Sequence, residues 1–290
     1  MNRPFHDQQD IEILQSLIQK AVRRGDAEIV RRVIQCLVQR NNQEWLRRRA
    51  PILVFEECWT YGQHFEHPKD EQQLTEQLVR LAGTIKNKNA CGLGSLAYQL
   101  YRGDETVIHN DAMEKDLLFI AVAMSKPQPF WEWANHGIEG EGQKKLVENA
   151  NKGFIYADQP WDKAFMLAAT YLAVTSKISE TIISSKPPDE FPIWIAIDRH
   201  TTLGVEKITA AANEIKLEPA IALWLTFYFE GAQCNEMVPS PWWEQEKIWR
   251  MKKLGLTLEE GNRYYERLKP VLKKILQEEE ERLREVIFNL

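Results

Sequence analysis

The sequence predicts an all-α protein, a multi-helix bundle in two packed halves. Apolar residues recur at the i, i+3, i+4 spacing of a buried helical face in most segments. Residues that start or stop helices separate these segments, and the residue-by-residue alternation of a half-buried strand is almost absent. A charged, glycine-bearing segment at 137–142 marks the expected boundary, which gives an N-terminal half over residues 1–150 and a C-terminal half over residues 151–290.

The first three helices carry the clearest local signals. Apolar spacing predicts one helix over residues 13–22 and a second over residues 29–38. Gly25 is suited to the left-handed conformation that ends a helix, and Asp26 can cap the second by accepting from its free N–H groups. A third helix starts at Glu44 and brings three consecutive arginines before an apolar run.

Later helices follow from the same spacing and from their end signals. They are predicted over residues 70–87, 90–101, 165–174, 205–215 and 219–231, with others ending near 124 and starting near 241. Asn110 or Asp111 can cap the helix that ends near 124. Residues 193–197 have strand propensity but no partner strands, which favours a helix or an extended connector. Thr257 with Glu260 forms a capping box for the last helix, where Pro270 predicts a kink or a break.

Composition and charge limit the classes of function that fit this sequence. The 290 residues carry a formal net charge of −5, so no global basic field indicates a nucleic-acid partner. The first fifty residues are locally basic, with ten Lys and Arg against six Asp and Glu. Four scattered cysteines without CxxC spacing disfavour a disulfide framework or a zinc site. No secretory signal is evident and the apolar runs are too short to span a membrane, so we expect a cytoplasmic protein.

Several motifs resemble one known family. KAVRRGD (Lys20 to Asp26), WLRRR (Trp45 to Arg49) and the pair Glu56-Glu57 look like the C-terminal, clamp-loader-type helical domain of the MgsA/RarA class of AAA+ ATPases. They look closer still to stand-alone phage and plasmid proteins that carry this domain without the ATPase. LAATYLAVTSK, AIDRHTTLG and FEGAQCN, which start at residues 167, 196 and 229, fit the same group. The chain departs from the pattern at Pro51, Cys58 and Trp59, and residues 61–162 match poorly.

The resemblance implies a collar-like protein without a motor, in the setting of DNA replication or repair. No GxxxxGK[ST] loop is present to hold nucleotide phosphates, and no cofactor or metal is expected. The residues carried over from the family's motifs are Asp26, Trp45, Glu56, Glu57, Asp198, His200 and Thr201. If apolar residues of the first two helices point inward, the nearby arginines should lie outside and contact phosphates. These candidate nucleic-acid-binding residues are Arg23, Arg24, Arg31, Arg32, Arg47, Arg48 and Arg49.

Each other candidate site has a structural alternative. Glu57, His64 and His67 could ligate a metal, but a polar loop with solvated histidines fits the segment better. Asp198 and His200 could form an acid–histidine pair. We favour a buried histidine that joins two helices, with Thr201 or Thr202 capping the helix at 205. For Glu56 and Glu57, the favoured interpretation is a salt bridge from one of them to an arginine of the first two helices.

Three functions therefore remain open. We favour a non-catalytic protein that binds DNA or a replication partner. A pure oligomerisation or adaptor module without nucleic-acid binding is the first alternative, and an enzyme of unknown class using Asp198 and His200 is the second. We also expect a homo-oligomer, since four of the ten tryptophans lie where helices start. These four are Trp131, Trp133, Trp242 and Trp243.

Overall fold

The computed structural model describes residues 7–108, 111–188 and 191–288. It confirms the all-α prediction: thirteen α-helices and four short 3₁₀ or π segments account for the regular structure of this part of the chain, and isolated bridges are its only β-type pairs. The predicted cap Asn110 lies outside the described residues. None of the helices in the described ranges combines the length and the apolar character needed to cross a bilayer.

The chain divides into two compact units. Unit 1 comprises residues 1–43, 186–235 and 251–290, and unit 2 comprises residues 44–185 and 236–250. The predicted boundary near residue 150 is therefore wrong. It falls inside α8 (Glu141–Tyr156), which packs on α9 (Pro160–Thr175) within unit 2. A glycine-bearing segment marks a turn between helices, and it need not separate two cores.

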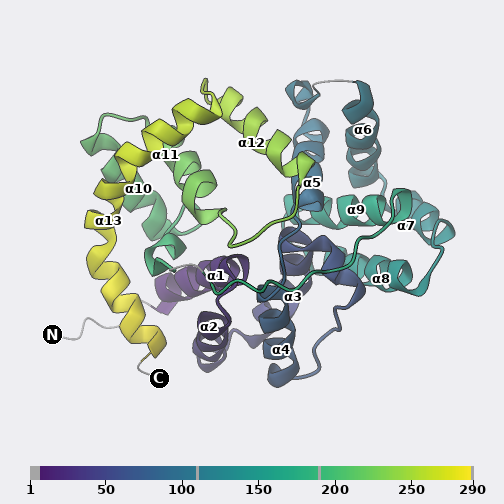
Figure 1. The fold of residues 1–290 in the computed structure, drawn as a ribbon, viewed down its shortest axis with the longest axis horizontal. Helices are drawn as coiled ribbons and strands as arrows, with labels where there is room; N and C mark the ends of the chain where they lie inside the picture. Colours follow the sequence, from purple (N-terminus) through teal and green to yellow (C-terminus); the bar gives the residue numbers. More distant parts are fainter. Residues whose placement is uncertain (1–6, 109–110, 189–190, 289–290) are drawn as a thin grey trace. The chain divides into compact units, whose positions relative to one another are not determined.

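Unit 1 is assembled from three separate stretches of sequence. Its helices are α1 (Asp7–Arg24), α2 (Ala27–Gln39), α10 (Thr202–Glu214), α11 (Pro219–Thr226) and α13 (Leu258–Phe288), with the 3₁₀ turn η3 (Ile193–Ala196) and the π turn η4 (Phe227–Gly231). α1 packs on α2, and the long α13 runs beside α10 and α11 (Figure 1). Segments from both ends of the sequence thus share one core.

The local signals of unit 1 act largely as predicted. Gly25 has a φ of 79°, and Asp26 Oδ1 accepts from the Ile29 backbone N–H at 2.9 Å to cap α2. Thr257 and Glu260 form the reciprocal capping box of α13. Pro270 lies inside α13 without ending it. The helix therefore tolerates the loss of the one backbone hydrogen bond that proline cannot donate.

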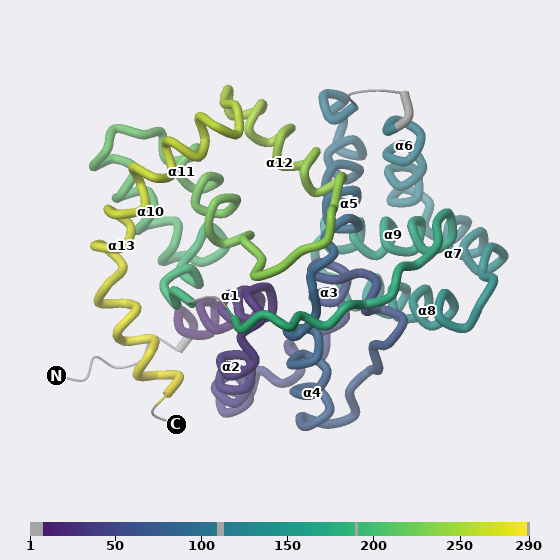
Figure 2. Tube along the Cα trace, in the orientation of Figure 1, coloured from purple at the N-terminus to yellow at the C-terminus, as the bar shows by residue number. Residues whose placement is uncertain are grey.

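Unit 2 holds most of the remaining helices. They are α3 (Gln43–Glu57), η1 (Trp59–Gln63), α4 (Glu71–Ala82), α5 (Asn89–Tyr101), η2 (Glu105–Val107), α6 (Asp111–Ser125), α7 (Pro127–His136), α8 and α9. α12 (Pro241–Lys253) contains the point where the chain passes back to unit 1. After α9 the chain runs extended (Figure 2), and Ile182 O accepts from the Ile85 N–H at 2.8 Å.

Two glycines allow α5 to serve as the centre of unit 2. A Cβ on Gly92 would lie 2.2 Å from the Trp243 backbone nitrogen, and one on Gly94 would lie 2.7 Å from the Ala164 carbonyl oxygen. On two faces of α5 the helix backbone therefore packs directly against the backbone of another segment. Only glycine, which has no Cβ, permits so close an approach. This close packing holds the C-terminal end of α5 beside α6 and α9.

Candidate nucleic-acid interface

The family-like motifs of unit 1 converge on a buried ionic cluster. The carboxylate of Asp198, 1% exposed, pairs with Lys20 Nζ and accepts from Ser16 and from the His200 backbone N–H. Burial opposes ionisation of Asp198, but Lys20 and then His200 outweigh it and hold its pKa well below the ordinary value. KAVRRGD and AIDRHTTLG thus meet through a buried ion pair.

A second buried pair joins FEGAQCN to the same helix. Arg24 Nη2 lies 3.1 Å from Glu230 Oε1, while Tyr265 and Lys269 of α13 donate to Glu230 Oε2 at 2.6 and 2.9 Å. Arg23 donates to the Gly231 carbonyl. The π turn η4 presents both groups toward α1, and such turns often reorient residues in this way.

This arrangement corrects the prediction that Arg23 and Arg24 lie outside. They are 2% and 8% exposed, because their guanidinium groups reach back to η4 instead of out to water. Neither can contact a phosphate in this fold. Both instead hold elements of unit 1 together.

Asp198 and His200 do form a hydrogen-bonded pair. His200 Nδ1 lies 3.0 Å from Asp198 Oδ2, and its Nε2 lies 3.3 Å from Arg199 Nη1. His200 is about half exposed, so the prediction of a buried histidine is wrong and Asp198 is the buried partner. Thr201 caps α10 by accepting from Gly204 N–H at 3.0 Å, as predicted. The contacts of this segment are those of a tight helix start, and they favour the structural interpretation.

The acidic pair of α3 is also tied to cations, but not to those predicted. Glu56 pairs with Arg49 two turns earlier in the same helix, at 2.9 Å, and Glu57 pairs with Lys88 at 3.1 Å. Arg49 also binds Asp162 at 2.7 Å. Burial alone would lower the pKa of Arg49, yet Asp162 and Glu56 raise it. Arg49 is therefore engaged within unit 2, like Arg23 and Arg24 within unit 1.

The metal alternative finds no support from the geometry. Glu57 is fully buried against Lys88, whereas His64 is exposed. The ring of His67 lies between Phe65 and Tyr156, at 5.3 and 6.2 Å. In the described ranges no three His, Cys, Asp or Glu side chains gather closely enough to hold a metal ion.

Four of the seven arginines stay accessible, two in each unit. In unit 1, Arg31 is exposed and Arg32 pairs with Glu28 at 2.8 Å on the surface of α2. In unit 2, Arg47 is exposed, and Arg48 donates to the Tyr156 carbonyl at 3.2 Å and to Asp158. Trp45, another family-motif residue, is half-buried at the start of α3. Only these four arginines keep their predicted role open.

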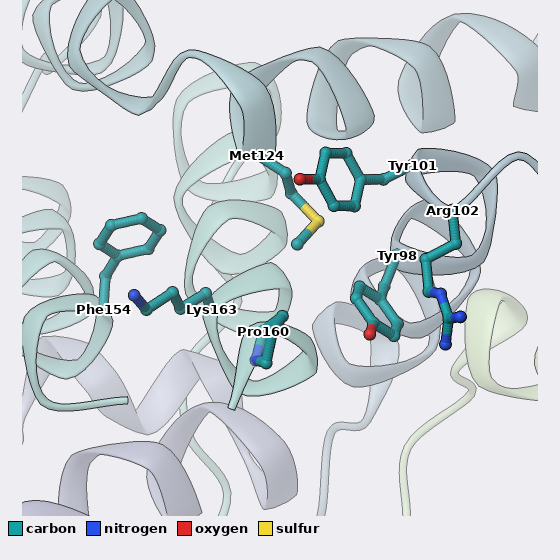
Figure 3. Close-up of a pocket in the computed structure, with 7 residues that line it drawn as sticks. All are labelled: Tyr98, Tyr101, Arg102, Met124, Phe154, Pro160 and Lys163. Carbon is teal, nitrogen blue, oxygen red and sulfur yellow. The ribbon is translucent and has the colours of Figure 1, made fainter. Parts of the chain in front are cut away.

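Unit 2 also contains a pocket that the sequence did not reveal. Its volume is about 310 Å³, and it lies between the C-terminal end of α5, α6, α8 and the start of α9. Its lining residues are Tyr98, Tyr101, Arg102, Met124, Phe154, Pro160 and Lys163. Figure 3 shows Lys163 beside Phe154 on one side, with Tyr98 and Arg102 on the other.

The pocket combines aromatic rings with two cations. Tyr98 stacks on Tyr101 with ring centroids 6.4 Å apart and also meets the exposed Trp161 edge-on. Lys163 Nζ lies 5.3 Å from the centre of the Phe154 ring. The lining includes no acidic residue. A sequence signal existed in the tyrosine pair at i, i+3 followed by arginine, but only the fold brings Lys163 to it.

Arg48 of α3 lies near one rim of this pocket. Arg48 donates to the carbonyl of Tyr156, the last residue of α8, and to Asp158 in the short connection from α8 to α9. The same connection is flanked by Phe154 and Pro160, which line the pocket. Cations and exposed aromatic rings therefore gather around one turn of unit 2.

Comparisons of the chain with family models, with curated proteins and with solved structures find no match. The resemblance to the MgsA/RarA-type domain therefore stays a prediction, carried by the motifs alone. The fold and site define a helical protein with two internally braced units, of which unit 2 contains an aromatic, cationic pocket.

Proposed function

We propose that the protein binds nucleic acid without chemically altering it, through the surface of unit 2 around the α8–α9 connection. The observation that carries the proposal is the meeting of Arg48 with this connection, beside a pocket lined by Arg102, Lys163 and aromatic rings. Cations that neutralise phosphates supply most of the affinity for nucleic acid, and aromatic rings add base stacking.

The ion pair between Arg48 and Asp158 is weak enough for a phosphate to displace the carboxylate. Arg48 and Asp158 have side chains 42% and 74% exposed, and such surface pairs contribute only ~0–1 kcal/mol. A phosphate can therefore replace Asp158 at little expense. Arg47, one residue earlier, is exposed as well. The association with DNA replication or repair rests on the family-like motifs and belongs to the proposal.

The test is a salt titration of binding to single-stranded, duplex and forked DNA. The double variant Arg47→Ala/Arg48→Ala should weaken binding at low salt and reduce the salt slope by about 1 for each lost phosphate contact. Arg31→Ala/Arg32→Ala is the matched control, because it removes two accessible arginines from unit 1. Equal losses for the two variants would contradict the assignment to unit 2, and absence of binding by the wild type at low salt would contradict the function itself.

The adaptor alternative has one specific observation in its favour. Leu118, Phe119 and Val122 on α6 are 43%, 36% and 59% exposed and share one helical face. An exposed apolar face on a helix suits a protein partner. Pull-down or light-scattering experiments on Val122→Glu would separate this function from nucleic-acid binding, which the substitution should leave unchanged.

A further inference from the structure

We infer that the pocket of unit 2 takes one unstacked nucleobase together with its phosphate, so that the preferred ligand is single-stranded. This inference rests on the proposed function and narrows it to a ligand class. It concerns residues that none of the predicted sites includes, namely Tyr98, Tyr101, Arg102, Phe154 and Lys163.

The size of the pocket sets the first limit. About 310 Å³ is at the lower end of the range for small-molecule sites, enough for one ring system and its immediate substituents. A base inside a duplex is stacked on both faces and cannot enter such a pocket without leaving the helix. The bases of a single strand are free to do so.

The walls of the pocket supply surfaces for an aromatic ligand. Tyr101 is 46% exposed, and the stacked pair Tyr98 and Tyr101 lies at one end, while Phe154 lies at the other. Met124 lies beside Tyr101 (Figure 3) and adds a polarisable thioether. Stacking on such rings tolerates any base, because every base has a π face.

The charges of the pocket favour an anionic ligand. Arg102 is exposed at the end of α5, and Lys163 contacts the Phe154 ring. Among the side chains that the structure describes, no carboxylate forms an ion pair with either cation, in contrast to Arg48 and Arg49. Two cations that form no such ion pair, placed at the edge of an aromatic pocket, match the phosphate and base of a nucleotide unit.

The experiment compares two labelled strands by fluorescence anisotropy. One is a thymidine tract, and the other is a tract of the same length built from abasic tetrahydrofuran units, which keeps the phosphates and removes every base. The wild-type protein should bind the thymidine tract at least about fivefold more tightly, since one stacked base accounts for that factor or more. Tyr101→Ala should abolish the preference, whereas Tyr101→Phe, which keeps the ring, should retain it.

A control variant and the remaining outcomes complete the test. Ile155→Ala removes a side chain 68% exposed next to Phe154 that does not line the pocket, and it should change nothing. Equal affinity of the wild type for both tracts would overturn the inference and leave nucleic-acid binding intact. A base preference that survives Tyr101→Ala in a variant with wild-type circular dichroism would also overturn it. Failure to bind either tract or duplex at low salt would refute both proposals together.

Discussion

Asp198 illustrates how single residues brace this protein. Its buried carboxylate gathers a lysine, a serine and a histidine from two distant stretches of sequence. A buried charge of this kind is tolerated only when its partners are in place. These contacts, and the cap that Thr201 provides to α10, give the AIDRHTTLG motif a structural role.

The first residue-scale prediction concerns Lys20. Lys20→Met leaves Asp198 with a buried charge and should lower the free energy of unfolding by about 3–5 kcal/mol. Urea denaturation measures this loss. The double variant Lys20→Met/Asp198→Asn should lose clearly less than the sum of the two single variants. Additive losses would show that the two side chains do not form the ion pair.

The second residue-scale prediction concerns pH. Burial, and then Lys152, lowers the pKa of His67 from 6.5 to about 4. The unfolded chain therefore binds a proton near pH 6.5 that the folded protein takes up only near pH 4, so stability from this residue is full above pH 6.5 and declines toward pH 4. His67→Gln should flatten the dependence of unfolding free energy on pH between 7.5 and 5. An unchanged slope would contradict the shifted pKa.

At the scale of elements, helix ends were easier to predict from the sequence than helix neighbours. Gly25, Asp26 and the Thr257–Glu260 box act through contacts within a few residues, so the local sequence determines them. Glu230, the partner of Arg24, and Asp162, one of the two partners of Arg49, lie 206 and 113 residues away, and no local pattern indicates them. The sequence consequently predicted more accessible arginines than the structure has. It did not reveal the pocket, because residues from four different helices line it.

The element-scale prediction concerns the glycines of α5. Gly92→Ala would force a methyl group to within 2.2–2.5 Å of the backbone at Trp242 and Trp243, which has no room to move aside as a side chain would. We expect severe destabilisation, beyond about 3 kcal/mol, or no folded protein. Gly83→Ala is the control, because its nearest neighbour would be at 3.5 Å. Thermal unfolding followed by circular dichroism should show the control near the wild type.

At the scale of the whole molecule, we still predict self-association, but for a different reason than the positions of the tryptophans. Trp131 and Trp243 are 8% and 5% exposed, so they belong to the core of unit 2 and do not form an outer contact surface. The exposed face of α6 described above is a better reason to expect assembly.

Light scattering across a concentration series tests this prediction. We expect a mass above the 33.9 kDa of one chain, and we expect Val122→Glu to return it to that value. A constant monomer mass for the wild type would remove the prediction. An oligomer unaffected by the substitution would place the contact elsewhere.

The division of the chain into interleaved units has a consequence for its synthesis. Unit 2 begins at residue 44 but receives its last segment, residues 236–250, only after part of unit 1 has been translated. Until then Gly92 lacks the backbone of Trp242 and Trp243, which packs directly against it in the folded protein. Unit 1 in turn needs α13, because Tyr265 and Lys269 of this helix bind the carboxylate of Glu230. We therefore expect the core of unit 2 to close only after residues 236–250 have been translated, and the core of unit 1 only after α13 has been translated, so that the two units do not fold strictly one after the other along the chain.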